Sequence, residues 1–586
     1  MANAIPESLY PEAATVKLTR PSGSGDLAQD LEGSQQLRNC RNPAFIVNPH
    51  RHHTPTLLLL ATVCVLACTI QVHAADDTYI VRTTAGLAHG AVRPGGGAEF
   101  LGIPYAEPPV GKLRWRAPVP KKPWKGIRDA TSFGWSCPQP LLGGAWNRHD
   151  AENNREDCLY INVFTPAWPA AKPLPVIFWI HGGANIGGSG FGSFYTEGTL
   201  PEHGVVLVTF NYRLGVLGFF AHSELTRESP HHASGNYGLM DQILALQWVH
   251  SNIARFGGDP NNITVAGQSA GSMDIGMLMT SPLAAGLFQM AIAESGAAFS
   301  PPVVPLADEE RFSEEAAADL HAPAGRHAIA FLRKIPAADL LAKLGDRAFE
   351  WPGGFTPDVD GWVLPTSPQQ VFAGGKEAAI PLLIGATSRE FGDSEPLDAL
   401  RESIQSAAGD LAPQALALYG LAGDQPPASD PLYGSASVQW NADKMFHCPI
   451  ATQALWHSEA HQPTYEYEFD RPIPGQEAQG ALHSAELPYV FGNFPKSGNL
   501  AGNFAQIDTR LADLIETYWT NFAIAGDPNY RSGDSPNLPA WPRLDDSQRY
   551  LIFTPDGGIA LSNGPLRAPQ CDLYRKMLTQ SIKQEQ

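Results

Sequence analysis

A serine between glycines is the strongest chemical signal in this chain. Gly267–Gly271 reads Gly-Gln-Ser-Ala-Gly, which matches the pattern G-x-S-x-G. The apolar run Ile263–Ala266 before it predicts a β-strand, and the stretch after it can form a helix. A sharp turn between strand and helix strains the backbone of its serine and exposes the hydroxyl. Because glycine and serine are common in ordinary turns, Ser269 needs support from the rest of the chain.

A serine hydroxyl becomes a good nucleophile when a base takes its proton, and an acid must hold that base in the correct tautomer. In hydrolases with this turn, the acid and then the histidine follow the serine along the chain. Glu390 and His483 fit that order. Chain order alone does not select one histidine among the 18 present, and a structural role is the alternative for each.

A glycine-rich segment could stabilise the negative charge that develops on a substrate oxygen. His181–Ala184 reads His-Gly-Gly-Ala, follows the apolar run Val176–Ile180 and precedes further glycines. Glycines let backbone N–H groups converge on one point, and each such donor contributes about 3–4 kcal/mol in the transition state. We assign this oxyanion hole to the N–H groups of Gly183, Ala184 and Ala270.

Several apolar runs predict the buried parallel strands of an α/β protein, because their apolarity is continuous rather than alternating. These runs are Val176–Ile180, Val205–Val208, Ile263–Ala266, Met290–Ala293 and Leu382–Ile384. The segment Asp241–Arg255 has apolar residues at helical spacing. Strands that alternate with helices favour a mostly parallel sheet. The helix-forming stretch Pro301–Ala378 predicts an insertion that covers the site.

The composition is that of a globular protein with one large domain. The chain has 586 residues, of which 43% are hydrophobic and 17% are charged. The net charge of −19 argues against a nucleic acid or an anionic membrane surface as a partner. The oligomeric state stays open.

The segment 56–75 predicts a signal peptide. It begins with an apolar run that is too short to span a bilayer comfortably and ends in small residues near Ala74. We therefore expect export to the periplasm or the medium, with 76–586 as the mature domain. Residues 1–55 are polar and predict a disordered extension or a mis-assigned start. An uncleaved anchor and lipid attachment at Cys68 are the alternatives.

Motifs along most of the chain resemble one family. Phe256–Gly271 resembles the active-site serine signature of type-B carboxylesterases, the group that includes the cholinesterases, and Glu156–Pro166 resembles the second signature of that family. Further matches follow in the expected order: Leu101–Ala106, Pro108–Gly111, Leu113–Trp115, Asn211–Gly215, Val359–Gly361, Trp519–Ala523 and Gly526–Asn529.

The resemblance implies an α/β-hydrolase fold, with a mostly parallel central sheet, flanking helices and large insertions over an active-site gorge. It also implies Ser269 as nucleophile, Glu390 as acid and His483 as base in the cleavage of small carboxylic esters through an acyl-enzyme. It implies no metal and no cofactor.

The cysteines predict one disulfide. An exported protein permits disulfides, and the resemblance implies one between Cys137 and Cys158, beside the gorge. Nothing comparable pairs Cys448 with Cys571, so we expect two unpaired thiols there.

The chain departs from the family pattern at several positions near the site. Ala184 replaces a glycine that is usual in the oxyanion motif, but it keeps its N–H group. Gln268 stands where a glutamate is common, which removes a carboxylate beside the serine and speaks against a cationic substrate. Thr387 and Phe391 replace residues often found around the acid. Trp146 could bind a quaternary ammonium through cation–π contact, although packing is the usual role of a loop tryptophan.

Two other functions are compatible with the motifs. One is a lipase that acts on longer-chain acylglycerols, but no long apolar lid is evident in the sequence. The other is a binding module that has lost catalysis, because a fold does not determine its function. Such modules typically lack the serine or the histidine, and both are present here.

Overall fold

The computed structural model describes residues 3–4 and 79–584, apart from 144–145, 324, 352–353, 393–394, 424 and 532–537. The predicted signal peptide at 56–75 and nearly all of the predicted extension at 1–55 lie outside the described residues. Among the helices that are described, none combines the length and the apolarity needed to cross a membrane.

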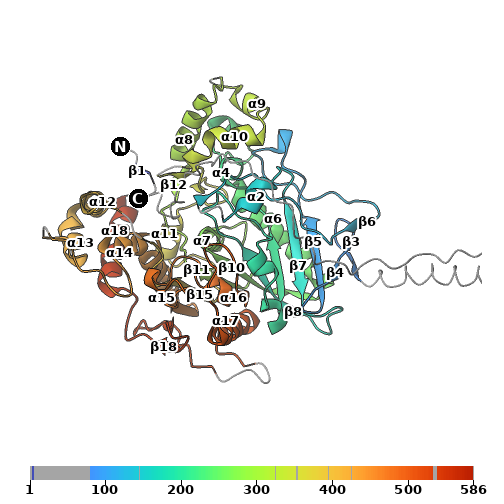
Figure 1. Cartoon of the computed structure of the whole chain (residues 1–586). Helices are drawn as coiled ribbons and strands as arrows, with labels where there is room; N and C mark the ends of the chain where they lie inside the picture. The colour runs from blue at the N-terminus through green and yellow to red at the C-terminus, as the bar shows by residue number, and fades with distance from the viewer. Residues whose placement is uncertain are drawn as a thin grey trace, which may run out of the picture. The chain divides into compact units, whose positions relative to one another are not determined.

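An 11-stranded sheet forms the centre of the molecule (Figure 1). Its strands, in spatial order, are β18 (Ile559–Leu561), β17 (Leu551–Phe553), β16 (Thr464–Phe469), β15 (Leu382–Thr387), β11 (Met290–Glu294), β10 (Gly258–Gln268), β8 (Leu174–Ile180), β9 (Val206–Phe210), β7 (Tyr160–Thr165), β5 (Ala98–Pro104) and β4 (Ala91–Val92). The strands from β17 to β9 are mutually parallel, and antiparallel pairs occur toward the two edges. Each run predicted as a parallel strand lies in this sheet, which confirms the α/β prediction.

The apolar runs are continuous because both faces of the sheet are buried. On β8, the side chains of Val176, Phe178 and Ile180 enter one hydrophobic core, whereas those of Ile177 and Trp179 enter the other. Helices supply the second layer of each core: α6 (Tyr237–Asn252) and α7 (Ala270–Thr280) to the first, and α17 (Gln506–Ala525) to the second.

The segment predicted as a helical insertion is helical. Its helices are α8 (Leu306–Asp319), α9 (Ala328–Leu332), α10 (Ala337–Leu344) and α11 (Pro368–Ala373). Figure 1 shows α8, α9 and α10 gathered beside α4 (Gly215–Gly218) at one end of the molecule. A second group of helices consists of α12 (Leu397–Ala408), α13 (Ala412–Leu418), α14 (Ala436–Ala442), α15 (Cys448–Glu459) and α18 (Ala568–Gln584).

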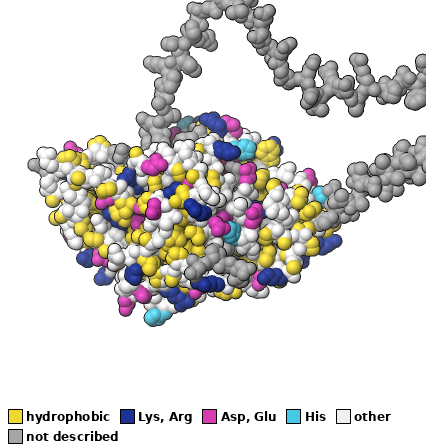
Figure 2. Space-filling view, turned by 60° about the horizontal axis from the view of Figure 1, so that its bottom comes forward, with side chains coloured by type: hydrophobic (Ala, Val, Ile, Leu, Met, Phe, Trp, Pro, Cys, Tyr) yellow, Lys and Arg dark blue, Asp and Glu magenta, His cyan; other side chains and the backbone are white. Residues whose placement is uncertain are grey.

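Charged side chains of both signs are scattered over the face that Figure 2 shows. Lys and Arg stand singly among acidic and apolar side chains on that face. It therefore offers no continuous basic surface of the kind that binds a phosphate backbone.

The expectation that Cys448 and Cys571 are unpaired is wrong. The structure joins them in a disulfide, with their Cα atoms 4.5 Å apart, although they are 123 positions apart in sequence. Cys448 is the first residue of α15 and Cys571 lies in α18, and these helices pack side by side. The pair forms because two helices that are distant in sequence pack together, so no local sequence pattern could predict it. The predicted Cys137–Cys158 disulfide is present.

Candidate active site

Ser269 stands in the sharp turn between β10 and α7, with φ 58° and ψ −127°. A non-glycine residue adopts such angles only when the surrounding structure holds it there. The turn is tight because Gly271 packs against the end of β8, where a Cβ on it would lie 2.1 Å from the carbonyl oxygen of Ile180. The side chain of Ser269 is half-buried, and no described residue forms a hydrogen bond with its hydroxyl. The strained turn expected from the sequence is therefore present.

The glycine-rich segment after β8 bends back beside this serine. Gly183, Ala184 and Asn185 have consecutive positive φ angles of 110°, 56° and 58°. The carbonyl of Gly183 accepts hydrogen bonds from the N–H groups of Ile186 and Gly187, which closes the turn. Within the described part of the chain, no group accepts from the N–H of Gly183 or Ala184. Both donors are thus available to a bound oxyanion.

A buried carboxylate holds the segment from the side of the serine helix. Asp274 of α7 accepts a hydrogen bond from the side-chain amide of Asn185 at 2.9 Å and one from Gln242 of α6 at 2.5 Å. Burial raises the pKa of Asp274 to about 7. Its link to Asn185 couples the glycine-rich segment to α7, the helix that begins directly after Ser269. Sequence reasoning missed Asp274, because an acid within an apolar helix is not by itself a signal.

Glu390 and His483 meet although they lie 93 residues apart in sequence. The imidazole Nδ1 of His483 donates to Glu390 Oε2 at 2.5 Å. Glu390 Oε1 accepts from the Ser295 hydroxyl at 2.7 Å and from the Thr387 N–H at 2.9 Å. The backbone N–H of His483 also donates to the Glu390 carbonyl at 3.1 Å. Side chain and backbone therefore fix the acid and the base together.

The two groups shift each other's pKa in opposite directions. Burial disfavours the charged form of Glu390, but His483 and the hydrogen-bond donors outweigh burial and hold the pKa of Glu390 below its ordinary value. Burial also disfavours a charged imidazole, but Glu390 outweighs it and raises the pKa of His483 above its ordinary value. An ionised acid beside a titratable base is the arrangement that general-base catalysis requires.

Non-glycine residues with positive φ gather around this site. Those described here are Ala184, Asn185, Ser269, Ser295, Glu390 and Ser484. Strained backbone persists where packing and hydrogen bonds over-determine it, and functional sites are the usual place. The hydroxyl of Ser295, which donates to Glu390, was not recognisable from the sequence, because serine is common in loops.

The imidazole Nε2 of His483 faces Gln268. The side-chain amide nitrogen of Gln268 lies 3.2 Å from it, and no described hydrogen bond joins His483 to Ser269. The ring of Phe446 packs on the imidazole with a centroid separation of 4.8 Å. The site therefore brings serine, acid and histidine into one region, with Gln268 as the partner of Nε2.

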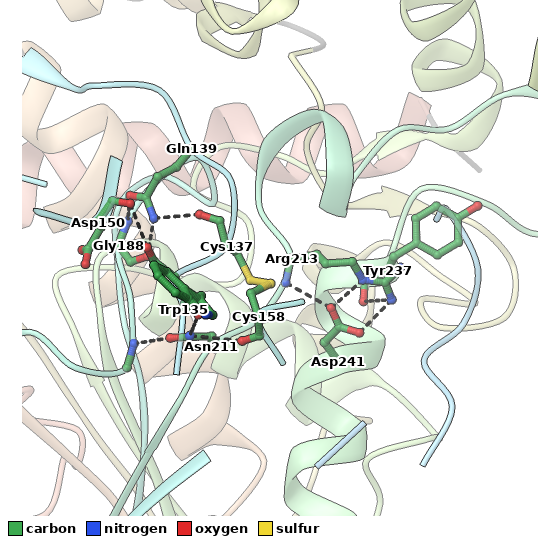
Figure 3. Close-up of a disulfide and its surroundings, with 12 residues drawn as sticks. Trp135, Cys137, Gln139, Asp150, Cys158, Gly188, Asn211, Arg213, Tyr237 and Asp241 are labelled. Carbon is green, nitrogen blue, oxygen red and sulfur yellow. Dashed lines mark hydrogen bonds and ion pairs between the residues drawn. A yellow bond between two sulfur atoms is a disulfide. The ribbon is translucent and has the colours of Figure 1, made fainter. Parts of the chain in front are cut away.

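The Cys137–Cys158 disulfide closes a loop that is hydrogen-bonded to the glycine-rich segment (Figure 3). Gln139, which is 3% exposed, donates to the Gly188 carbonyl at 2.9 Å and accepts from the Gly188 N–H at 2.8 Å. Asp150, further along the loop, accepts from the Ser189 hydroxyl at 3.0 Å. The loop thus supports the segment that carries the candidate oxyanion donors.

Trp146 belongs to the same loop and stands against the glycine-rich segment. A Cβ on Gly183 would lie 3.1 Å from its ring, and Trp146 is 36% exposed. Its ring is therefore placed beside the candidate oxyanion donors.

No metal site accompanies this arrangement in the described part of the chain, where no group of three or more His, Cys, Asp or Glu residues is placed to hold an ion. The described residues of the site supply a hydroxyl, an imidazole hydrogen-bonded to a carboxylate, and backbone N–H donors.

Comparisons with known proteins agree with this geometry. The model of the carboxylesterase family matches residues 77–568. The chain belongs to the carboxylesterase family. It is 35% identical over 517 residues to the fumonisin B1 esterase of Sphingopyxis macrogoltabida, covering 84% of this chain and 90% of that protein. It is 34% identical over 508 residues to the para-nitrobenzyl esterase of Bacillus subtilis, covering 83% of this chain and 96% of that protein.

Solved structures give the same result for this carboxylesterase. A PNB esterase matches with a TM-score of 0.71 at 32% identity, covering 86% of this chain and 99% of that chain. A thermophilic PNB esterase matches with a TM-score of 0.72 at 34% identity, covering 85% and 100%. The fold is that of these α/β-hydrolases, and the protein is a carboxylic ester hydrolase.

Proposed function

We propose that Ser269 is the nucleophile, His483 the general base and Glu390 the acid that orients it. The observation that carries this assignment is the 2.5 Å hydrogen bond from His483 to Glu390, in the same site as a strained and half-buried serine. The hydroxyl of Ser269 has no hydrogen-bond partner among the described residues, so it is free to attack a substrate.

The reaction then proceeds in two halves. His483 Nε2 takes the proton of Ser269 while Oγ attacks the ester carbonyl, and the resulting oxyanion accepts hydrogen bonds from the N–H groups of Gly183, Ala184 and Ala270. The imidazolium gives its proton to the leaving alcohol, and the acyl group stays on Ser269. Water, activated by His483, then attacks the acyl-enzyme and releases the acid. Glu390 stays ionised throughout and stabilises the imidazolium.

Ser269→Ala tests this assignment. We expect kcat on p-nitrophenyl esters to fall by about 10⁴-fold or more, because the covalent step is lost. A fluorophosphonate probe should label the parent enzyme at Ser269 and should not label the variant. Unchanged circular dichroism is the control for folding. A variant that keeps more than a few per cent of the activity would contradict the assignment.

The chain length of the preferred ester is a separate question. Small soluble esters are the proposed substrates, and acylglycerols with long acyl chains are the alternative. A series of p-nitrophenyl esters from C2 to C16 decides between them. A maximum at the short end supports the proposal, whereas a maximum at C12 or longer, with activation at an oil–water interface, contradicts it.

We also propose that the chain is exported and cleaved near Ala74, which leaves 76–586 as the mature enzyme. Two disulfides within the described residues support this, because disulfides form and persist in oxidising compartments. N-terminal sequencing of protein from the periplasm or the medium should begin at Ala75 or Asp76. An intact Met1 on cytosolic protein, or a lipid on Cys68, would contradict the proposal.

A further inference from the structure

Gln268 contacts the candidate base at the atom that must accept the serine proton. The Nδ1 of His483 donates to Glu390, so a neutral imidazole presents its lone pair at Nε2. The amide nitrogen of Gln268 lies 3.2 Å from Nε2 and is therefore the donor of this hydrogen bond. Gln268 is 4% exposed, so water does not compete freely for the same position.

The position of Gln268 is well determined. It is the last residue of β10, directly before Ser269, and it pairs in register with Glu294 on β11. Its amide oxygen borders the glycine-rich segment, since a Cβ on Gly182 would lie 3.2 Å from it. One side chain therefore lies between the segment that carries the oxyanion donors and the imidazole.

The surroundings of the imidazole are acidic. Glu390 is hydrogen-bonded to it, and Glu486, in the same segment, acts on its charge. Glu294 of β11 acts on Glu486 in turn. Burial raises the pKa of Glu486 well above its ordinary value and that of Glu294 to about 8. His447 faces Glu390 from the π-helix Asp443–His447, and Tyr467 faces the same acids from β16. Glu390 is thus the acid that stays ionised beside His483 at neutral pH. A carboxylate at position 268 would add a second negative charge at Nε2 itself.

We propose that Gln268 is a positioning residue of the triad, which holds the imidazole of His483 by its Nε2 atom and keeps it in the neutral form that accepts a proton. The proposal rests on the assignment of His483 as the base. When substrate binds, the Ser269 hydroxyl displaces the amide nitrogen from Nε2. Nε2 then takes the serine proton and passes it to the leaving alcohol, and the uncharged amide returns to Nε2 once the product has left.

The pH profile of kcat/KM tests the proposal, because a side chain that only fills space would not move it. Gln268→Glu is nearly isosteric and introduces the charge, whereas Gln268→Met keeps the length and removes the hydrogen bond. Gln247→Glu adds the same charge on an exposed position of α6 and is the matched control. The substrate is p-nitrophenyl acetate, measured from pH 5 to 9 in constant ionic strength.

We expect Gln268→Glu to move the acid limb of the profile upward by about one pH unit, because the new carboxylate favours the imidazolium. Gln268→Met should move the limb upward by less and lower kcat about tenfold, since the imidazole is no longer held. Gln247→Glu should match the parent. If the acid limb of the Gln268→Glu profile lies at the same pH as that of the parent enzyme, the inference is overturned. If Gln268→Glu does not fold, the same result for Gln268→Met overturns it. An inactive parent enzyme, or a fully active Ser269→Ala variant, would instead overturn the proposed function.

Discussion

The serine side of the site is made of backbone, whereas the histidine side is made of side chains. On the serine side, the ends of β8 and β10 pack so closely that Gly271 has no room for a Cβ, and the candidate donors are backbone N–H groups. On the histidine side, Glu390 and His483 come from separate segments and are held by side-chain hydrogen bonds. A short sequence motif can specify the first side, but the second depends on how distant segments pack.

Each side also has its own disulfide. Cys137–Cys158 closes the loop whose Gln139 pairs with Gly188 of the glycine-rich segment. Cys448–Cys571 anchors the start of α15, directly after His447, whose ring is 2.9 Å from the Thr387 carbonyl and near Glu390. The two covalent links therefore support different halves of the candidate site.

After the loss of the serine itself, removing the charge of Glu390 should give the largest effect, and it tests the histidine side alone. Glu390→Gln should lower kcat by about 10³-fold, because the imidazole loses both its orientation and the charge that stabilises its protonated form. Phosphonate labelling of Ser269 should slow in parallel while the melting temperature changes little. Near-parental activity would mean that another carboxylate is the triad acid.

The two disulfides should differ in how much each stabilises the folded protein. In the chain-entropy model, the closed loop of Cys448–Cys571 stabilises the fold by about 5 kcal/mol and that of Cys137–Cys158 by about 3 kcal/mol. Changing both cysteines of a pair to serine should thus lower the melting temperature more for Cys448 and Cys571. Substitution at Cys137 and Cys158 should instead change the selectivity between small and bulky esters. Equal losses of stability would contradict the separate roles.

Gln139 tests whether the disulfide loop acts on the serine side. Gln139→Ala should lower kcat about tenfold and leave KM nearly unchanged, because the glycine-rich segment loses the two hydrogen bonds at Gly188. Affinity for a trifluoromethyl ketone, which forms an oxyanion on the enzyme, should fall by the same factor. Gln247→Ala, on the exposed face of α6, is the control. A change confined to the melting temperature would show that Gln139 serves stability alone.

Asp150 should give the smallest effect, and the effect depends on pH. Burial raises the pKa of Asp150 to about 6 in the folded protein. The folded state therefore binds the proton more tightly than the unfolded chain, so stability falls as pH rises through about 4 to 6 and stays lower above that range. Asp150→Asn keeps an acceptor for Ser189 and removes the buried charge. It should raise the free energy of unfolding by about 1 kcal/mol at pH 8 and leave it unchanged at pH 4. Denaturant titrations at both pH values measure the difference, and an equal effect at both would refute it.

Much of the serine side could be predicted from the sequence. The glycines around Ser269 and after Ile180 determine where the backbone can take positive φ or approach another strand, and these are local properties. The continuous apolar runs likewise required strands that are buried on both faces. The positions of Glu390 and His483 followed from chain order together with the family resemblance.

Only the tertiary structure decided which side chains meet. It paired Cys448 with Cys571, brought Ser295 to Glu390, and set Gln268 against the imidazole of His483. The physical reason is that such contacts join segments that are far apart in sequence, or depend on where a distant loop is packed. A residue pattern encodes the conformations of its own backbone, whereas the partner of a buried polar side chain depends on the packing of the whole chain.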